Sequence, residues 1–112
     1  MEIEVRSLGQ VKVIKLRGKL SLGEPVERLR ETLDDLIASS ETHIVMDLSE
    51  VPMMDSSGIG LLVKYLTSAK HVGGSIRLLN PSTFVVRTLK MIGLLNLFDI
   101  FDDQQQAIAS FG

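Results

Sequence analysis

The run His43–Leu48 (HIVMDL) constrains the fold of this chain more than any other stretch. It is short and almost continuously apolar, which is typical of a central strand covered on at least one face. A polar loop follows, and from about Ser56 apolar residues recur at helical spacing. A buried strand that leads through a loop into a helix indicates an α/β fold, in which functional groups collect at the carboxyl edge of a parallel sheet.

The rest of the chain alternates between strand and helix patterns in the same way. The predicted strands cover residues 2–6, 11–16, 43–48 and 75–79, with an edge strand or irregular packing within 94–101. The predicted helices cover residues 25–38, 56–72 and 82–92, and a short segment after Asp102 or Asp103. The short turn at Gly9-Gln10 makes the first two strands antiparallel, whereas strand–helix–strand crossovers are parallel. We therefore predict an α/β fold in which residues 1–112 form a single domain, with a mixed sheet of four or five strands, about four helices, and an N-terminal β-hairpin before the βαβ units.

Composition argues against several classes of function. The net charge is −2 and the charges are interspersed, so the chain lacks the clustered basic face of nucleic-acid-binding proteins. There is no cysteine for a disulfide or a thiolate metal site, and no apolar run approaches the roughly 18 residues of a membrane-spanning helix. The start of the chain does not resemble a signal peptide. We expect a cytoplasmic protein, a monomer or weak dimer, that binds no nucleic acid and does not insert into a membrane.

The loop after the central strand concentrates residues that carry chemistry. One carboxylate, two hydroxyls and two glycines occupy six positions: Asp55, Ser56, Ser57, Gly58 and Gly60. The first three are all good helix N-caps, yet one cap is sufficient. The two glycines lie near the start of the predicted helix, where each costs roughly 1 kcal/mol relative to alanine. A sequence that keeps both usually needs the close approach of another backbone, ligand or partner.

Ser56 is well placed to carry a phosphate. The dipole and the free N–H groups at a helix start favour an anion, whereas the adjacent Asp55 opposes it. A phosphoryl group adds a charge of about −1.5 to −2 and would disrupt an apolar interface formed there. These properties predict a switch at Ser56, with Ser57 as the second candidate, and such a switch needs no catalytic machinery in this chain.

A hydrolase built on either serine would need a nearby base, and only His43 and His71 are available. His43 begins the strand whose other end leads to the loop, and His71 lies about 22 Å along the helix from Ser56. Neither can reach a serine proton over the roughly 3 Å that transfer requires. We expect no catalytic residue and no enzyme activity.

A metal or nucleotide site is also disfavoured. Asp47, Glu50 and Asp55 could supply oxygen ligands, but Asp47 lies within the apolar strand and is expected to accept hydrogen bonds from loop N–H groups instead. The G-x-G at Gly58–Gly60 lacks the third glycine and the following acid of a dinucleotide site. We expect no metal and no cofactor.

The motif Met-Asp-Ser-Ser-Gly-Ile-Gly, which follows the strand end DLS, resembles the signature of the STAS family, and in particular of bacterial anti-sigma factor antagonists. The likeness extends to the hairpin start, the G-x-L loop, the strand HIVMDLSEV, the strand GG-x-I-R-L-L and the N-P helix start. The resemblance implies a STAS-like fold in which Ser56, the serine after the aspartate, is the phosphorylation site. It also implies two partners. One is an anti-sigma factor serine kinase of the histidine-kinase-like ATPase type, which binds the unphosphorylated protein and releases its sigma factor. The other is a serine phosphatase that reverses the modification.

A second function remains open within the same family. The chain could be an accessory or scaffold subunit of a lipid-transport ABC system, or of a stress-signalling complex, without a phosphate cycle. Such a subunit would bind its partner by the same edge of the sheet. The intact D-S-S-G sequence favours the phosphate switch.

The expected partner-binding surface combines the start of the second helix with the loop Gly18–Gly23. Its residues are Ser21, Met53, Met54, Asp55, Ser56, Ser57, Gly58, Gly60, Leu61 and Tyr65. Leu61 and Tyr65 are one turn apart and are expected to lie off the core stripe, as apolar contacts for a partner. The two methionines supply adaptable side chains, although core packing is the commoner role. Gly58→Ala is expected to weaken docking more than it changes stability. Loop 80–82 is expected at the same edge.

Overall fold

The computed structural model describes residues 1–112 and contains a five-stranded mixed sheet in the order β1-β2-β3-β4-β5. The strands are β1 Glu2–Leu8, β2 Val11–Arg17, β3 His43–Glu50, β4 Ser75–Leu79 and β5 Ile100–Phe101. The helices are α1 Glu24–Ala38, α2 Ser56–His71, α3 Thr83–Met91 and α4 Gln104–Ala109, with a 3-10 turn η1 at Leu95–Leu97. β1 and β2 are antiparallel, and the other neighbouring pairs are parallel. The predicted fold class, the hairpin and the βαβ units are confirmed.

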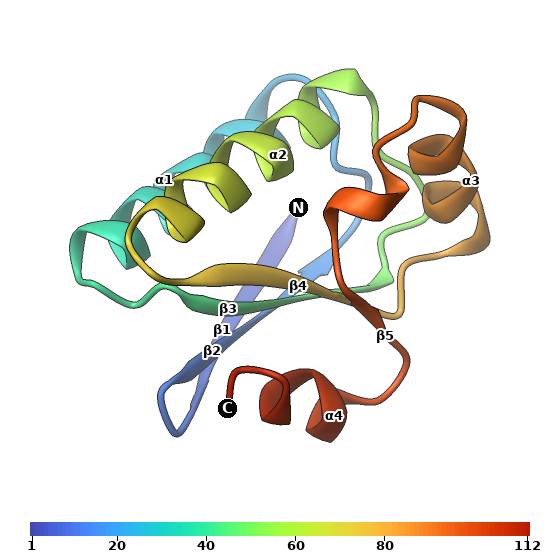
Figure 1. Ribbon diagram of the computed structural model, residues 1–112. Helices are drawn as coiled ribbons and strands as arrows, with labels where there is room; N and C mark the ends of the chain where they lie inside the picture. The colour runs from blue at the N-terminus through green and yellow to red at the C-terminus, as the bar shows by residue number, and fades with distance from the viewer.

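The helices lie on both faces of the sheet. Helices α1, α2 and α3 cover one face and α4 covers part of the other (Figure 1). The larger core, on the first face, joins the apolar sides of these three helices to the sheet, and a smaller core lies under α4. None of the helices combines the length and the apolar character needed to cross a bilayer.

Strand β3 is central because both of its faces are covered. Ile44 and Met46 belong to the larger core, whereas Val45 belongs to the smaller one. This two-sided burial explains why the strand is almost continuously apolar. Asp47 interrupts it, and its carboxylate accepts a hydrogen bond from the Ser49 N–H at 3.0 Å. The predicted acceptance from backbone N–H is confirmed, but the donor lies within β3 and not in the loop that follows.

Three helices begin at side-chain caps. The carboxylate or hydroxyl oxygens of Asp55, Ser82 and Asp103 accept hydrogen bonds from backbone N–H groups in the first turns of α2, α3 and α4. Helix α1 has no side-chain cap and instead has Pro25 in its first turn, where the missing N–H is not needed. These local devices explain why the helix starts could be predicted within a few residues.

Candidate functional site

Two loops that are far apart in the sequence meet at the carboxyl edge of the sheet. The loop between β2 and α1 runs beside the loop between β3 and α2, and backbone hydrogen bonds join them. The N–H of Gly18 donates to the Glu50 carbonyl at 3.0 Å, and the N–H of Leu20 donates to the Met53 carbonyl at 3.1 Å. The Leu20 carbonyl in turn accepts from the Asp55 N–H at 3.2 Å. The parallel pairing of β2 and β3 therefore continues past the strand ends and fixes the two loops as one unit.

Asp55 ties the two loops together through its side chain. One carboxylate oxygen accepts from the Gly58 N–H at 3.0 Å and caps α2, while the other accepts from the Leu22 N–H at 2.9 Å. The hydrogen bond from Leu22, followed by that from Gly58, lowers the pKa of Asp55. The carboxylate is therefore held in its charged form directly beside Ser56.

Ser56 is the first residue of α2 and is exposed, whereas Ser57 is half-buried. Because Asp55 provides the cap, neither serine hydroxyl is needed for that purpose. The Ser56 hydroxyl thus stands at the positive end of the α2 dipole, open to a second protein. This is the arrangement that the proposed switch requires.

Gly58 is needed by the packing of the chain itself. A Cβ atom at this position would lie 2.6 Å from the Leu20 carbonyl oxygen and 2.8 Å from Leu20 Cγ. The absence of a side chain therefore lets the β2–α1 loop approach the start of α2. A partner is therefore not needed to explain this glycine, and Gly58→Ala is expected to lower stability, whereas its effect on docking stays a prediction. Gly60 is different, since a Cβ there would meet no atom within 4 Å.

The expectation that Leu61 and Tyr65 lie off the core is wrong. Both side chains are only 4% exposed, and Met54 is 2% exposed, so none of the three presents a surface to a partner. Helix α2 packs against α1 as well as against the sheet, which buries a wider face than the one stripe predicted from helical spacing. The exposed apolar residue that sequence reasoning missed is Leu22, which is 77% exposed. The signal in the sequence that could have indicated this exposed side chain was a leucine within a polar loop that contains glycine.

The Tyr65 hydroxyl donates a hydrogen bond to the Asp34 carboxylate of α1. Burial, and then the interaction with Asp34, raises the pKa of Tyr65 to about 12. A folded-state pKa above the unfolded value contributes stability that is complete below pH about 10 and is lost as the pH rises through 12. Because this is the only tyrosine, its ultraviolet absorbance reports the titration without overlap.

We expect the phenol to ionise about two pH units higher in the folded protein than in urea. Tyr65→Phe should remove the part of the alkaline loss of stability that belongs to this group, while lysine titration remains in both proteins. Identical titration midpoints for folded and unfolded chains would show that the Tyr65 hydroxyl is neither buried nor bonded to Asp34 as described.

The other side chains considered for acid–base or metal chemistry, His43, His71 and Glu50, do not belong to the site at Ser56. His43 stacks on Phe111 with ring centroids 5.0 Å apart, at the opposite end of β3 from the loop, and His71 is the exposed last residue of α2. The Glu50 carboxylate lies 3.1 Å from the side-chain nitrogens of both Lys15 and Arg17. His43 and Glu50 are thus engaged by structural partners, and His71 lies at the far end of α2 from Ser56.

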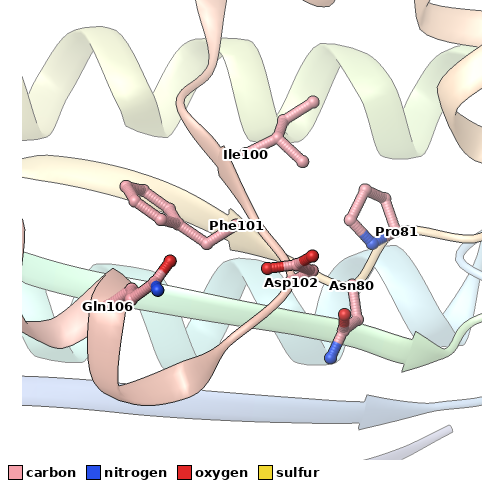
Figure 2. Close-up of a pocket in the computed structure, with 6 residues that line it drawn as sticks. All are labelled: Asn80, Pro81, Ile100, Phe101, Asp102 and Gln106. Carbon is pink, nitrogen blue, oxygen red and sulfur yellow. The ribbon is translucent and has the colours of Figure 1, made fainter.

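The third loop expected at this edge leads to a separate cavity. The Asn80 N–H donates to the Phe101 carbonyl at 2.8 Å, which ties this loop to β5. Asn80, Pro81 and residues of β5 and α4 line a cavity of about 420 Å³, the largest in the molecule (Figure 2). Ser56 and the two joined loops are not among its lining residues, so cavity size does not identify the site at Ser56.

The sequence of this chain is similar to those of several known proteins. The family model described as STAS domain matches residues 2–107. An anti-sigma F factor antagonist of Paenibacillus polymyxa is 28% identical over 109 residues, which cover 96% of this chain and 92% of that protein. An anti-sigma F factor antagonist of Lysinibacillus sphaericus is 34% identical over 83 residues, which cover 73% of this chain and 70% of that protein.

Solved structures with this fold include two of SpoIIAA. The anti-sigma factor antagonist SpoIIAA in its unphosphorylated form is 27% identical, with a TM-score of 0.84 and coverage of 97% of this chain and 95% of that chain. The Bacillus cell fate determinant SpoIIAA in the phosphorylated form is 26% identical, with a TM-score of 0.79 and coverage of 99% of this chain and 100% of that chain. A relative of this fold therefore exists both with and without phosphate.

Proposed function

The chain belongs to the STAS domain family, and we propose that it is an anti-sigma factor antagonist whose binding is switched by phosphate on Ser56. The unphosphorylated protein docks onto an anti-sigma factor kinase of the histidine-kinase-like ATPase type and frees the sigma factor. The kinase then transfers a phosphoryl group from its own ATP to the Ser56 hydroxyl, leaving ADP. A serine phosphatase removes the group. In this scheme the chain acts in the cytoplasm and catalyses no reaction itself.

The observation that carries this proposal is the exposed Ser56 hydroxyl at the start of α2. Asp55 already caps the helix, so a phosphoryl group on Ser56 would not remove a structural hydrogen bond. Similarity to relatives named as anti-sigma F factor antagonists, and to SpoIIAA in a phosphorylated form, supports the same assignment.

The docking surface consists of the exposed and half-buried residues of the two joined loops and the start of α2. These residues are Ser21, Leu22, Met53, Asp55, Ser56, Ser57 and Gly60. Phosphate on Ser56 would place about −1.5 to −2 charges beside the ionised Asp55 in the middle of this surface. A partner that binds the neutral hydroxyl would then have to bury several unpaired negative charges, which is unfavourable.

The experiment is phosphorylation of the purified protein by anti-sigma kinases of the same organism with ATP and Mg²⁺, followed by intact-mass measurement. We expect the wild type and Ser57→Ala to gain one phosphoryl group and Ser56→Ala to gain none. Modification of Ser56→Ala but not of Ser57→Ala would move the switch to Ser57. If no kinase modifies the protein while a transporter ATPase co-purifies with it, the scaffold function replaces the switch.

A further inference from the structure

A groove of about 260 Å³ runs between α1 and the first half of α2, and Ser57 is one of its lining residues. Two of its lining residues, Val26 and Leu61, are apolar and almost completely buried, so the deepest part of the groove is apolar. Leu22 stands at its mouth and is 77% exposed. Leu22 is therefore the one exposed apolar side chain of the groove, and Ser57, the neighbour of the candidate phosphorylation site in the sequence, lines the same groove.

Gly60 lines this groove, and nothing in the chain itself requires a glycine there. The residue is exposed, its backbone is helical, and a Cβ atom would meet no other atom within 4 Å. Glycine is unfavourable at such a helical position because it loses the most conformational freedom on folding. Gly58, by comparison, is accounted for by Leu20. The space above Gly60 is therefore available to a group from outside the chain.

The charged residues of the groove leave one positive charge without an ion-pair partner. Arg30 pairs with Glu27 at 3.6 Å on the α1 side. Lys64 on the α2 side forms no ion pair, and its Nζ lies 5.4 Å from the centroid of the Tyr65 ring. The groove therefore combines an exposed leucine with an ammonium group that forms no ion pair, which fits a segment that carries an apolar side chain next to a carboxylate.

We propose that the anti-sigma kinase inserts such a segment into this groove, with its apolar side chain against Leu22 and its carboxylate at Lys64. This inference rests on the proposed function, since it names the part of the docking surface that holds the partner. A protein segment is the occupant because Ser57 lies in the groove next to Ser56, so a kinase that reaches Ser56 also covers the groove. The clearance at Gly60 lets the inserted segment lie close to the α2 backbone.

The first test fills the groove and measures affinity. The purified kinase that modifies Ser56 is titrated, in the presence of ADP, with wild type, Gly60→Leu and Thr67→Leu. Thr67 is an exposed residue two turns further along the same face of α2, so its variant adds an identical exposed side chain outside the groove. We expect Gly60→Leu to bind roughly tenfold or more weakly and Thr67→Leu to bind like the wild type. Equal affinities of all three would overturn the proposal.

The second test removes the charge without adding volume. Lys64→Gln should bind about fivefold more weakly and show a smaller dependence of affinity on salt, because one ion pair is lost. Lys70→Gln, which alters an exposed lysine in the last turn of α2, is the matched control and should bind like the wild type. Identical salt dependence of the two variants would overturn the role of Lys64. If the wild type binds no kinase, both the proposed function and the proposed role of the groove are contradicted. If the wild type binds and the groove variants bind equally well, only the role of the groove is contradicted.

Discussion

Replacing Gly58 with alanine is expected to destabilise the protein by about 2 kcal/mol and to lower its melting temperature by roughly 10 °C. The new Cβ atom would lie 2.6 Å from the Leu20 carbonyl oxygen, which is backbone and cannot rotate away. That carbonyl accepts the hydrogen bond from the Asp55 N–H, so the joint between the two loops would have to open. Overpacking of this kind costs up to about 3 kcal/mol, and the better helix propensity of alanine returns about 1 kcal/mol.

The matched control for this prediction is Gly60→Ala. It makes the same substitution on the same helix, at a position where the added Cβ meets nothing within 4 Å. It should therefore stabilise the protein by about 0.5–1 kcal/mol through helix propensity and loss of freedom in the unfolded chain. Urea unfolding of both variants measures the difference, which we expect to be about 3 kcal/mol. A Gly58→Ala variant as stable as Gly60→Ala would show that the two loops do not approach as closely as described.

Replacing Ser56 with aspartate is expected to weaken binding to the anti-sigma kinase by about 10- to 100-fold, which corresponds to about 1.4–3 kcal/mol. The substitution places a permanent negative charge beside the ionised Asp55, at the centre of the docking surface. Phosphate carries up to twice that charge, so the phosphorylated wild type should bind more weakly still. Ser56→Ala adds no charge and should keep the wild-type affinity. Calorimetric titration with the purified kinase compares all four proteins.

A control distinguishes an effect of negative charge at Ser56 from an effect of added negative charge elsewhere on the protein. Thr83 is the exposed first residue of α3, as Ser56 is of α2, and it follows a serine cap. Thr83→Asp therefore alters net charge and helix geometry in the same way, at a site outside the docking surface, and should bind like the wild type. The switch mechanism would be contradicted if Ser56→Asp and Ser56→Ala bound the kinase with equal affinity.

Most of the fold follows from local patterns in the sequence. The period of apolar residues distinguishes strands from helices, and the caps and Pro25 mark helix starts, because these effects act within a few residues. The parallel arrangement of β2, β3 and β4 follows from the helical crossovers between them. The position of Ser56 at the start of α2 is local in the same sense, since it depends only on the capping aspartate before it.

The errors at the site all concern contacts between distant segments. Spacing along α2 predicts one buried stripe, but α1 packs beside it and also covers Leu61 and Tyr65. Gly58 is required because the Leu20 carbonyl approaches it closely, and Leu20 lies in a loop more than thirty residues earlier in the chain. No pattern within α2 reports which backbone will approach it.

The sequence by itself determined the order of strands and helices, the central place of β3, and the location of a hydroxyl beside a capping carboxylate. Periodicity and capping decide these features, and both are short-range. Only the tertiary structure decided which side of α2 faces solvent, which of the two glycines serves the chain's own packing, and that Ser57 lines a groove with a lysine that forms no ion pair. These features depend on how α1 and the β2–α1 loop pack against α2, which is a long-range property that residue spacing does not encode.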